Sequence, residues 1–111
     1  MAHLDVFPNP DAGSADTIPY LLDVQGSLLD GLPSRVVIPL AYPEAIETLP
    51  ILRLNPKVGV GETTLVALTQ NMAALPRRLL KTPVANLSSQ REEILAAIDF
   101  LFTGFRTWPN T

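Results

Sequence analysis

The residues of this sequence that could perform acid–base or metal chemistry are few and are not grouped. His3 is the single histidine, and Asp5 is the only carboxylate near it. A metal site built on a histidine needs further ligands at a suitable spacing. A serine triad would need His3 beside a nucleophile in a G-x-S-x-G turn, and this motif is missing. We therefore expect neither a catalytic nor a metal-binding role for His3.

Other patterns with a known chemistry are incomplete. Gly59 and Gly61 do not extend to the G-x-G-x-x-G loop that holds a dinucleotide. The chain has no cysteine, which excludes disulfides, thiolate zinc sites and cysteine nucleophiles. Asp99 interrupts an apolar stripe beside Phe100, and we expect it to face solvent. The sequence predicts a binding protein that is not an enzyme and uses no metal or cofactor.

Charge and hydropathy limit the partners. The 111 residues carry a formal net charge of −3, with one small basic group at Arg77, Arg78 and Lys81. Because binding to a nucleic-acid backbone normally needs a basic surface, we expect no direct nucleic-acid binding. Apolar residues make up 47% of the chain, enough for one domain with a packed core. We expect no membrane span and no signal peptide, and a cytoplasmic location.

The strongest helical pattern covers residues 88–105. Ser89 and Glu92 have the spacing of a capping box, and Gly104 stands where a glycine often ends a helix. Apolar residues recur at steps of three and four and are expected on one broad face: Ile94, Leu95, Ile98, Leu101, Phe102 and Phe105. Such a helix must cover a sheet, pair with a second copy or present its end to a partner.

The preceding sequence alternates short strand patterns with prolines. Strands are expected at 4–7, 18–25, 35–41, 51–54, 57–60 and 63–69. Leu4 and Val6 should share one face of the first strand, while 71–76 is expected as a connector and 77–80 as an extended piece. Pro39 lacks an amide donor and indicates an edge, a bulge or a bend. This pattern predicts an α+β fold, with a mostly antiparallel sheet followed by one C-terminal helix.

The loop 26–34 carries two adjacent leucines, Leu28 and Leu29, between Ser27 and Asp30. Either one of them fills the core while the other is exposed, or both form a small apolar patch for a partner. The residues alone leave both interpretations open.

Several segments, in order along the chain, resemble the CcdB family, which comprises gyrase-poisoning toxins of toxin–antitoxin modules. They are Asp23-Val-Gln25, Arg35 with Val37-Ile-Pro-Leu-Ala41, Asn71-Met-Ala73 with Pro76, Leu87-Ser88, and 98–104. The resemblance implies a twisted antiparallel sheet with a small second sheet, an SH3-like barrel shared with Kid-type toxins, and one C-terminal helix. It also implies a homodimer with the helix ends near the two-fold axis.

By this resemblance the protein binds the A subunit of DNA gyrase, a topoisomerase, and traps the complex with cleaved DNA. A cognate CcdA-like antitoxin would neutralise it through an acidic tail that folds on binding, and the pair would act as a transcription repressor. The family's gyrase contacts lie in the loop after Asp-Val-Gln and at the helix end. The equivalent positions here are Gly26, Leu28, Leu29, Asp99, Thr103, Gly104 and Phe105.

Two departures from the family concern the end of the chain. The family typically ends Trp-Gly-Ile, with the tryptophan stacked on a gyrase arginine, and this chain has Thr103-Gly104-Phe105. Losing such a contact removes roughly 0.5–2 kcal/mol of cation–π energy. A non-family tail, 106–111, follows the single domain and contains Trp108. Trp108 is a candidate substitute anchor; alternatively, the protein has drifted from gyrase poisoning, or the tail is a disordered end.

Two other functions stay open. A divergent member would bind only its antitoxin and repress its operon with it. A MazF- or Kid-like toxin would cleave RNA with a basic groove and acid–base side chains, and the charge balance and single histidine weigh against that activity.

Overall fold

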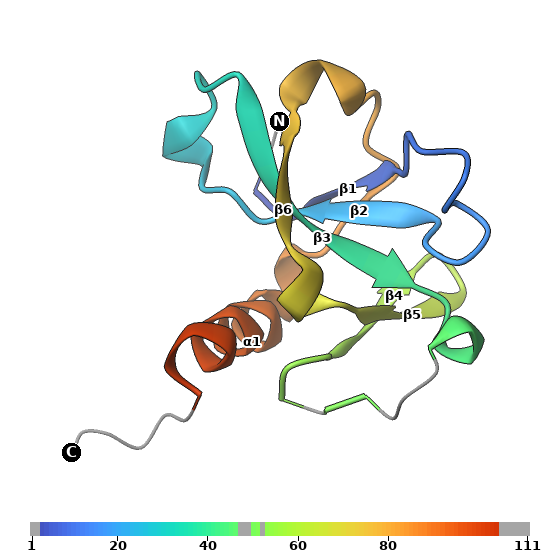
Figure 1. Ribbon diagram of the computed structural model, residues 1–111. Helices are drawn as coiled ribbons and strands as arrows, with labels where there is room; N and C mark the ends of the chain where they lie inside the picture. Colours follow the sequence, from blue (N-terminus) through green and yellow to red (C-terminus); the bar gives the residue numbers. More distant parts are fainter. Residues whose placement is uncertain (1–2, 47–49, 52, 105–111) are drawn as a thin grey trace.

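The computed structural model describes residues 3–46, 50–51 and 53–104 (Figure 1). Over these residues, seven strands form one antiparallel sheet that is nearly closed, and one α-helix follows them. The elements are β1 Asp5–Pro8, β2 Tyr20–Asp23, β3 Ser34–Ala41, β4 Lys57–Val60, β5 Thr63–Ala67, β6 Ala73–Pro76, β7 Ala85–Asn86 and α1 Arg91–Thr103. This is the predicted α+β, SH3-like fold.

β3 is the strand that joins the two parts of the sheet. One edge pairs with β2, and the other pairs first with β6, over Ser34–Val37, and then with β5, at Leu40 and Ala41. The larger part is β6-β3-β2-β1-β7, and the smaller part is the end of β3 with β5 and β4. Pro39 lies just before the pairing with β5, where the partner of β3 changes. A residue without an amide donor is tolerated at such a point.

Neighbouring residues of the central strands pack on opposite faces of the sheet, because side chains alternate along a strand. Val6, Leu22 and Ile38 belong to the larger core cluster, which also contains Leu4, as predicted. Their neighbours Phe7, Leu21 and Val37 form a smaller cluster with Leu80. Helix α1 contributes Ile94 to the larger cluster.

The start of α1 differs from the predicted capping box. Residues Ser88–Gln90 form a 3-10 turn, the helix begins at Arg91, and no side chain caps it. The Gln90 amide instead joins the turn to β4, because its Oε1 accepts from the Gly59 N–H (3.3 Å) and its Nε2 donates to the Lys57 carbonyl (3.0 Å). These contacts between distant segments position the helix start. The prediction of a capping box is therefore wrong.

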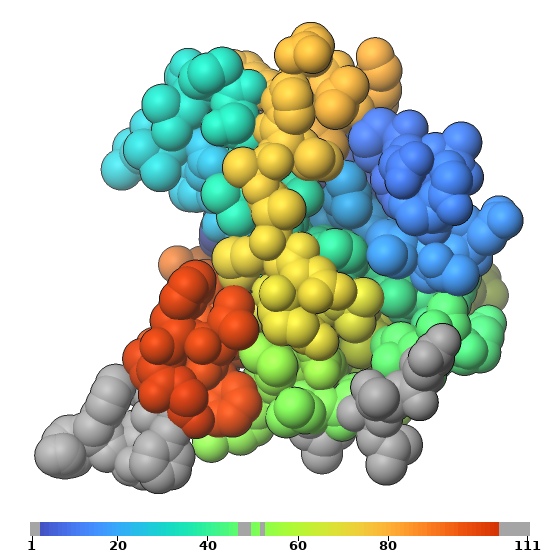
Figure 2. Space-filling view, viewed as in Figure 1, coloured from blue at the N-terminus to red at the C-terminus, as the bar shows by residue number. Residues whose placement is uncertain are grey.

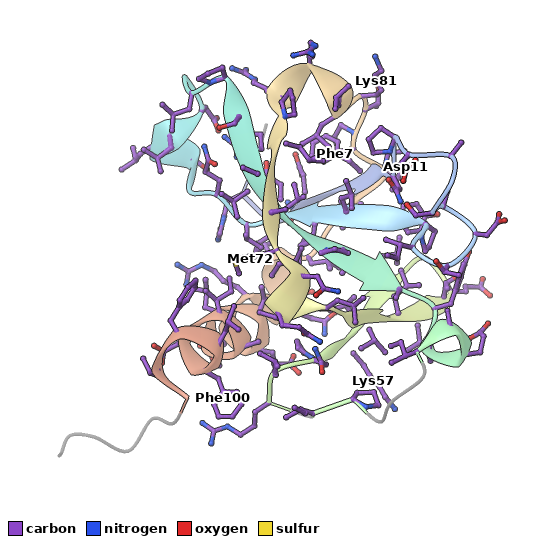
Figure 3. The ribbon with its side chains drawn as sticks, viewed as in Figure 1. Phe7, Asp11, Lys57, Met72, Lys81 and Phe100 are labelled. Carbon is purple, nitrogen blue, oxygen red and sulfur yellow. The ribbon has the colours of Figure 1, made fainter. Side chains whose placement is uncertain are left out.

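The apolar stripe of α1 is only partly covered. Ile94 and Ala97 are buried, whereas Phe102 is 71% exposed. A different side of the helix contacts the segment before β4, where the Arg53 guanidinium lies 4.9 Å from the centre of the Phe100 ring (Figure 3). The C-terminal half of α1 therefore extends away from the sheet to the edge of the molecule (Figure 1).

Three local predictions are wrong. Residues 53 and 54 form a turn and not a strand, with the amides of Leu54 and Asn55 both donating to the Ile51 carbonyl. The expected connector 71–76 contains β6, which pairs with the free edge of β3. The expected extended piece after it is a 3-10 turn, Arg77–Leu79.

Candidate functional site

The loop after β2 is built over a buried ion pair. Arg35 of β3 is completely buried, and its Nε and Nη2 lie 3.0 Å and 2.7 Å from Oδ2 of Asp23. Its Nη1 donates to Oδ1 of Asp30 (2.8 Å), and its Nη2 also donates to the Gln25 carbonyl (3.2 Å). A buried guanidinium needs partners for its donors, and here it binds both ends of one loop.

The Gln25 side chain connects the same loop to β3. Its Nε2 donates to the carbonyls of Leu29 and Ser34, and its Oε1 accepts from the Val36 N–H. Arg77, which follows β6, also contacts this loop, because its Nη1 donates to the Asp30 carbonyl at 2.7 Å. The loop is therefore held in one shape by hydrogen bonds from three other segments of the chain.

The two leucines of this loop are both exposed. The short 3-10 turn Ser27–Leu29 leaves Leu28 fully exposed and Leu29 50% exposed. The interpretation in which one leucine fills the core is therefore wrong, and the two leucines form a small apolar patch. Gly26 precedes them and is exposed as well.

The loop faces the first turns of α1 across a hollow of about 600 Å³. Gly26, Ser27, Leu28 and Leu29 line it from the loop, Arg91 and Leu95 from the helix, and His3 from the start of the chain. Figure 2 shows an indentation between the cyan loop and the red helix. The structure thus brings part of the predicted site against the first turns of α1, where Leu95 belongs to the predicted apolar face and Arg91 does not.

A strained residue places His3 at this hollow. Leu4 has a φ of 69°, which is uncommon for a bulky side chain and costs of order 1–3 kcal/mol. The conformation is held because the Leu4 N–H donates to the Asp23 carbonyl (2.8 Å) and its carbonyl accepts from Leu87 (2.9 Å). His3 then lies with Nδ1 3.4 Å from the Gln25 carbonyl oxygen.

The predicted residues at the helix end do not line the hollow. Asp99 and Thr103 lie one and two turns beyond Leu95 along α1, so the helix side of the surface extends for roughly 12 Å. Asp99 is half-buried, Thr103 is exposed, and the Thr103 hydroxyl donates to the Asp99 carbonyl (2.8 Å). Gly104 ends the helix as predicted, with a φ of 73°. Phe105 and Trp108 lie outside the described residues.

We name this region the loop–helix surface: it comprises the exposed residues 26–29, Arg91 and 102–104, and the half-buried Leu95 and Asp99. Sequence reasoning placed Leu95 and Phe102 on the broad apolar face of the helix but named neither as a contact residue, and it missed Arg91. The signal for Phe102 was available, because it lies seven residues after Leu95 and so falls on nearly the same side of the helix.

Elsewhere, an apolar cavity of about 360 Å³ opens on the sheet face that carries Phe7, between the β1–β2 loop and β6. None of the predicted site residues lines it. Asp11, at its rim, is labelled in Figure 3. Over the described ranges, no cluster of three or more potential metal ligands occurs, and no helix has the length and apolar character needed to cross a membrane.

The fold and the surface define the class: a small SH3-like barrel protein with a C-terminal helix and an exposed patch suited to contact with another protein. A family model described as CcdB protein matches residues 3–104. The chain therefore belongs to the CcdB family, whose members are toxins of toxin–antitoxin modules and inhibitors of DNA gyrase.

Proposed function

We propose that this toxin binds the A subunit of DNA gyrase through the loop–helix surface and holds the enzyme on cleaved DNA. The observation that carries the proposal is the exposure of Leu28 and Leu29 on a loop held by the buried Arg35 network. Family membership supports gyrase as the target, and these leucines stand at positions equivalent to the family's contacts.

The mechanism is binding without bond chemistry, and the protein is not an enzyme. A contact surface that already has its bound shape avoids the entropic cost of ordering a loop on association. Burying a leucine side chain in an interface contributes about 1.5–3 kcal/mol, so two leucines make an effective anchor. The protein would act by occupying a site on gyrase that must move for the DNA to be resealed.

A homodimer is the proposed assembly. Leu101 is half-buried on a side of α1 outside the loop–helix surface, so the outer half of α1 retains apolar area that a second copy could cover. A cognate antitoxin with an acidic segment would neutralise the dimer, and the pair would repress its own operon in the cytoplasm.

The helix end is the weakest part of the proposed contact. Thr103 stands at the position of the family's tryptophan and is exposed at the last turn of α1. This residue favours the second candidate function, a member that binds antitoxin and has lost gyrase poisoning. Replacement of Thr103 by tryptophan distinguishes the two, because it restores an aromatic anchor at an open position.

The test is a plasmid cleavage assay with purified gyrase and purified toxin. The proposed function predicts linear DNA after denaturation of the trapped complex, with more for Thr103→Trp. Capture of the toxin by a gyrase A fragment should accompany it. Antitoxin binding without gyrase capture would favour the divergent member, and degradation of RNA by the purified protein would favour the RNA-cleaving alternative.

A further inference from the structure

The hollow beside the leucine patch carries a cation without a partner among the described residues. Arg91 is exposed at the rim, and its side chain makes no ion pair or hydrogen bond with another described residue. It stands at the first position of α1, where the positive end of the helix dipole disfavours a cation. The position of Arg91 therefore gives the helix start no stabilising interaction with the helix dipole.

The electrostatic character of the hollow is opposite to that of the chain. Among the described residues, His3 and Arg91 are the titratable ones that line it and no carboxylate does, although the net charge of the chain is −3. Glu92 and Glu93 follow Arg91 and border a separate hollow with it, but neither of them lines this one. The hollow therefore suits a negative group better than a positive one.

The rest of the lining is apolar. Leu28 and Leu29 stand on the loop side, and Leu95, one helical turn beyond Arg91, stands on the opposite side. A carboxylate at Arg91 and an apolar side chain between the leucines would both be accommodated by a single segment of a partner. Electrostatic complementarity of this kind selects among partners more than it adds raw affinity.

We propose that Arg91 is a specificity-determining residue of the loop–helix surface, and that the hollow takes an acidic segment of the target protein. A carboxylate of that segment pairs with Arg91, and a neighbouring apolar side chain lies between Leu28 and Leu95. This proposal rests on the proposed function only in that the surface binds a protein; it does not require the target to be gyrase.

The experiment uses the purified full chain and two fluorescent probe peptides. Both are amphipathic helix-forming peptides of identical leucine pattern, one with glutamate and the other with lysine at every charged position. Anisotropy titrations should show the wild type binding the glutamate peptide roughly tenfold more tightly than the lysine peptide. Arg91→Glu should reverse this preference, and added salt should weaken the wild-type preference.

The matched control is Arg78→Glu, the same charge change at an exposed arginine that does not line the hollow; it should keep the wild-type preference. Equal binding of the two peptides, binding of neither, or an unchanged preference in a folded Arg91→Glu variant overturns the proposal.

The failure of this proposal is distinguishable from the failure of the proposed function. If a gyrase A fragment binds Arg91→Glu as tightly as wild type, the role of Arg91 is refuted and gyrase remains the target. If the protein prefers the glutamate peptide but does not bind gyrase, the role of Arg91 is supported and gyrase is refuted as the target.

Discussion

Nη2 of Arg35 lies 2.7 Å from Oδ2 of Asp23, and both side chains are completely buried. The pair joins β3 to the end of β2, immediately before the loop that presents Leu28 and Leu29. This completely buried ion pair therefore stands at the base of the loop that carries Leu28, the most exposed large apolar residue in the described part of the chain. We interpret the pair as the support that gives the loop its fixed shape.

Replacement of Arg35 by methionine should be strongly destabilising. It leaves the Asp23 carboxylate buried without a cation, and breaking a buried pair in this way costs about 3–5 kcal/mol. Urea unfolding should show a lower midpoint with little change in slope. Arg78→Met, a loss of an exposed arginine, is the control and should change stability by less than about 0.5 kcal/mol.

The double variant Asp23→Asn, Arg35→Met separates a lost pair from a stranded charge. It removes both charges. In the wild type the Gln25 N–H donates to Oδ1 of Asp23, and the asparagine keeps an oxygen that can accept this hydrogen bond. It should be more stable than Arg35→Met alone. Equal stability of the two variants would show that the stranded carboxylate is not the cause of the loss.

The start of α1 gives a paired prediction. Gln90→Ala removes the two hydrogen bonds to β4 and should cost about 1–2 kcal/mol. Ser89→Ala should change stability little, because Ser89 does not cap the helix. Thermal unfolding of both variants measures this, and a larger loss for Ser89→Ala would support the capping box after all.

Gly104 should resist replacement by alanine. Its φ of 73° is disfavoured for a residue with a Cβ, although a Cβ there would meet no atom within 4 Å. We expect a loss of about 1 kcal/mol from backbone strain alone. Gly31→Ala, also without a contact and without a positive φ, is the control. Equal effects of the two variants in chemical unfolding would argue against the strained helix end.

Thr69→Val should stabilise the protein. The Thr69 side chain is fully buried, and its hydroxyl has no hydrogen-bond partner among the described residues. Valine has nearly the same shape without the polar group, so the gain should be about 1 kcal/mol in the free energy of unfolding. A loss of stability in calorimetry would mean that the hydroxyl is satisfied in solution.

The fold was largely predictable because its signals are local. The β-branched run of β3, the alternation around Val6 and Leu22, and the apolar repeat of α1 each indicate an element without knowledge of its partners. Gly104 marked the helix end for the same reason. What the sequence could not supply was the pairing of distant segments, such as β6, whose Ala-Ala-Leu-Pro sequence has weak strand propensity and pairs because β3 offers a free edge.

The candidate site was predictable only in part. Leu28 and Leu29 were visible as an unusual pair, but their exposure depends on Arg35, a charge twelve residues from Asp23 that would normally be expected on the surface of a strand. The predicted capping box failed because Gln90 makes contacts with β4 that no local pattern reveals. Arg91 became notable only when the hollow placed it opposite the leucines.

The most direct test of the central claim is a calorimetric titration of a gyrase A fragment into three proteins: wild type, Leu28→Ser and Val84→Ser. Val84 is also an exposed apolar residue, 52% accessible, but it lies outside the loop–helix surface. We predict binding by the wild type and Val84→Ser with equal affinity, and at least roughly tenfold weaker binding by Leu28→Ser because a buried leucine contact is lost. No binding by the wild type, or equal affinity of Leu28→Ser and wild type, would contradict this account.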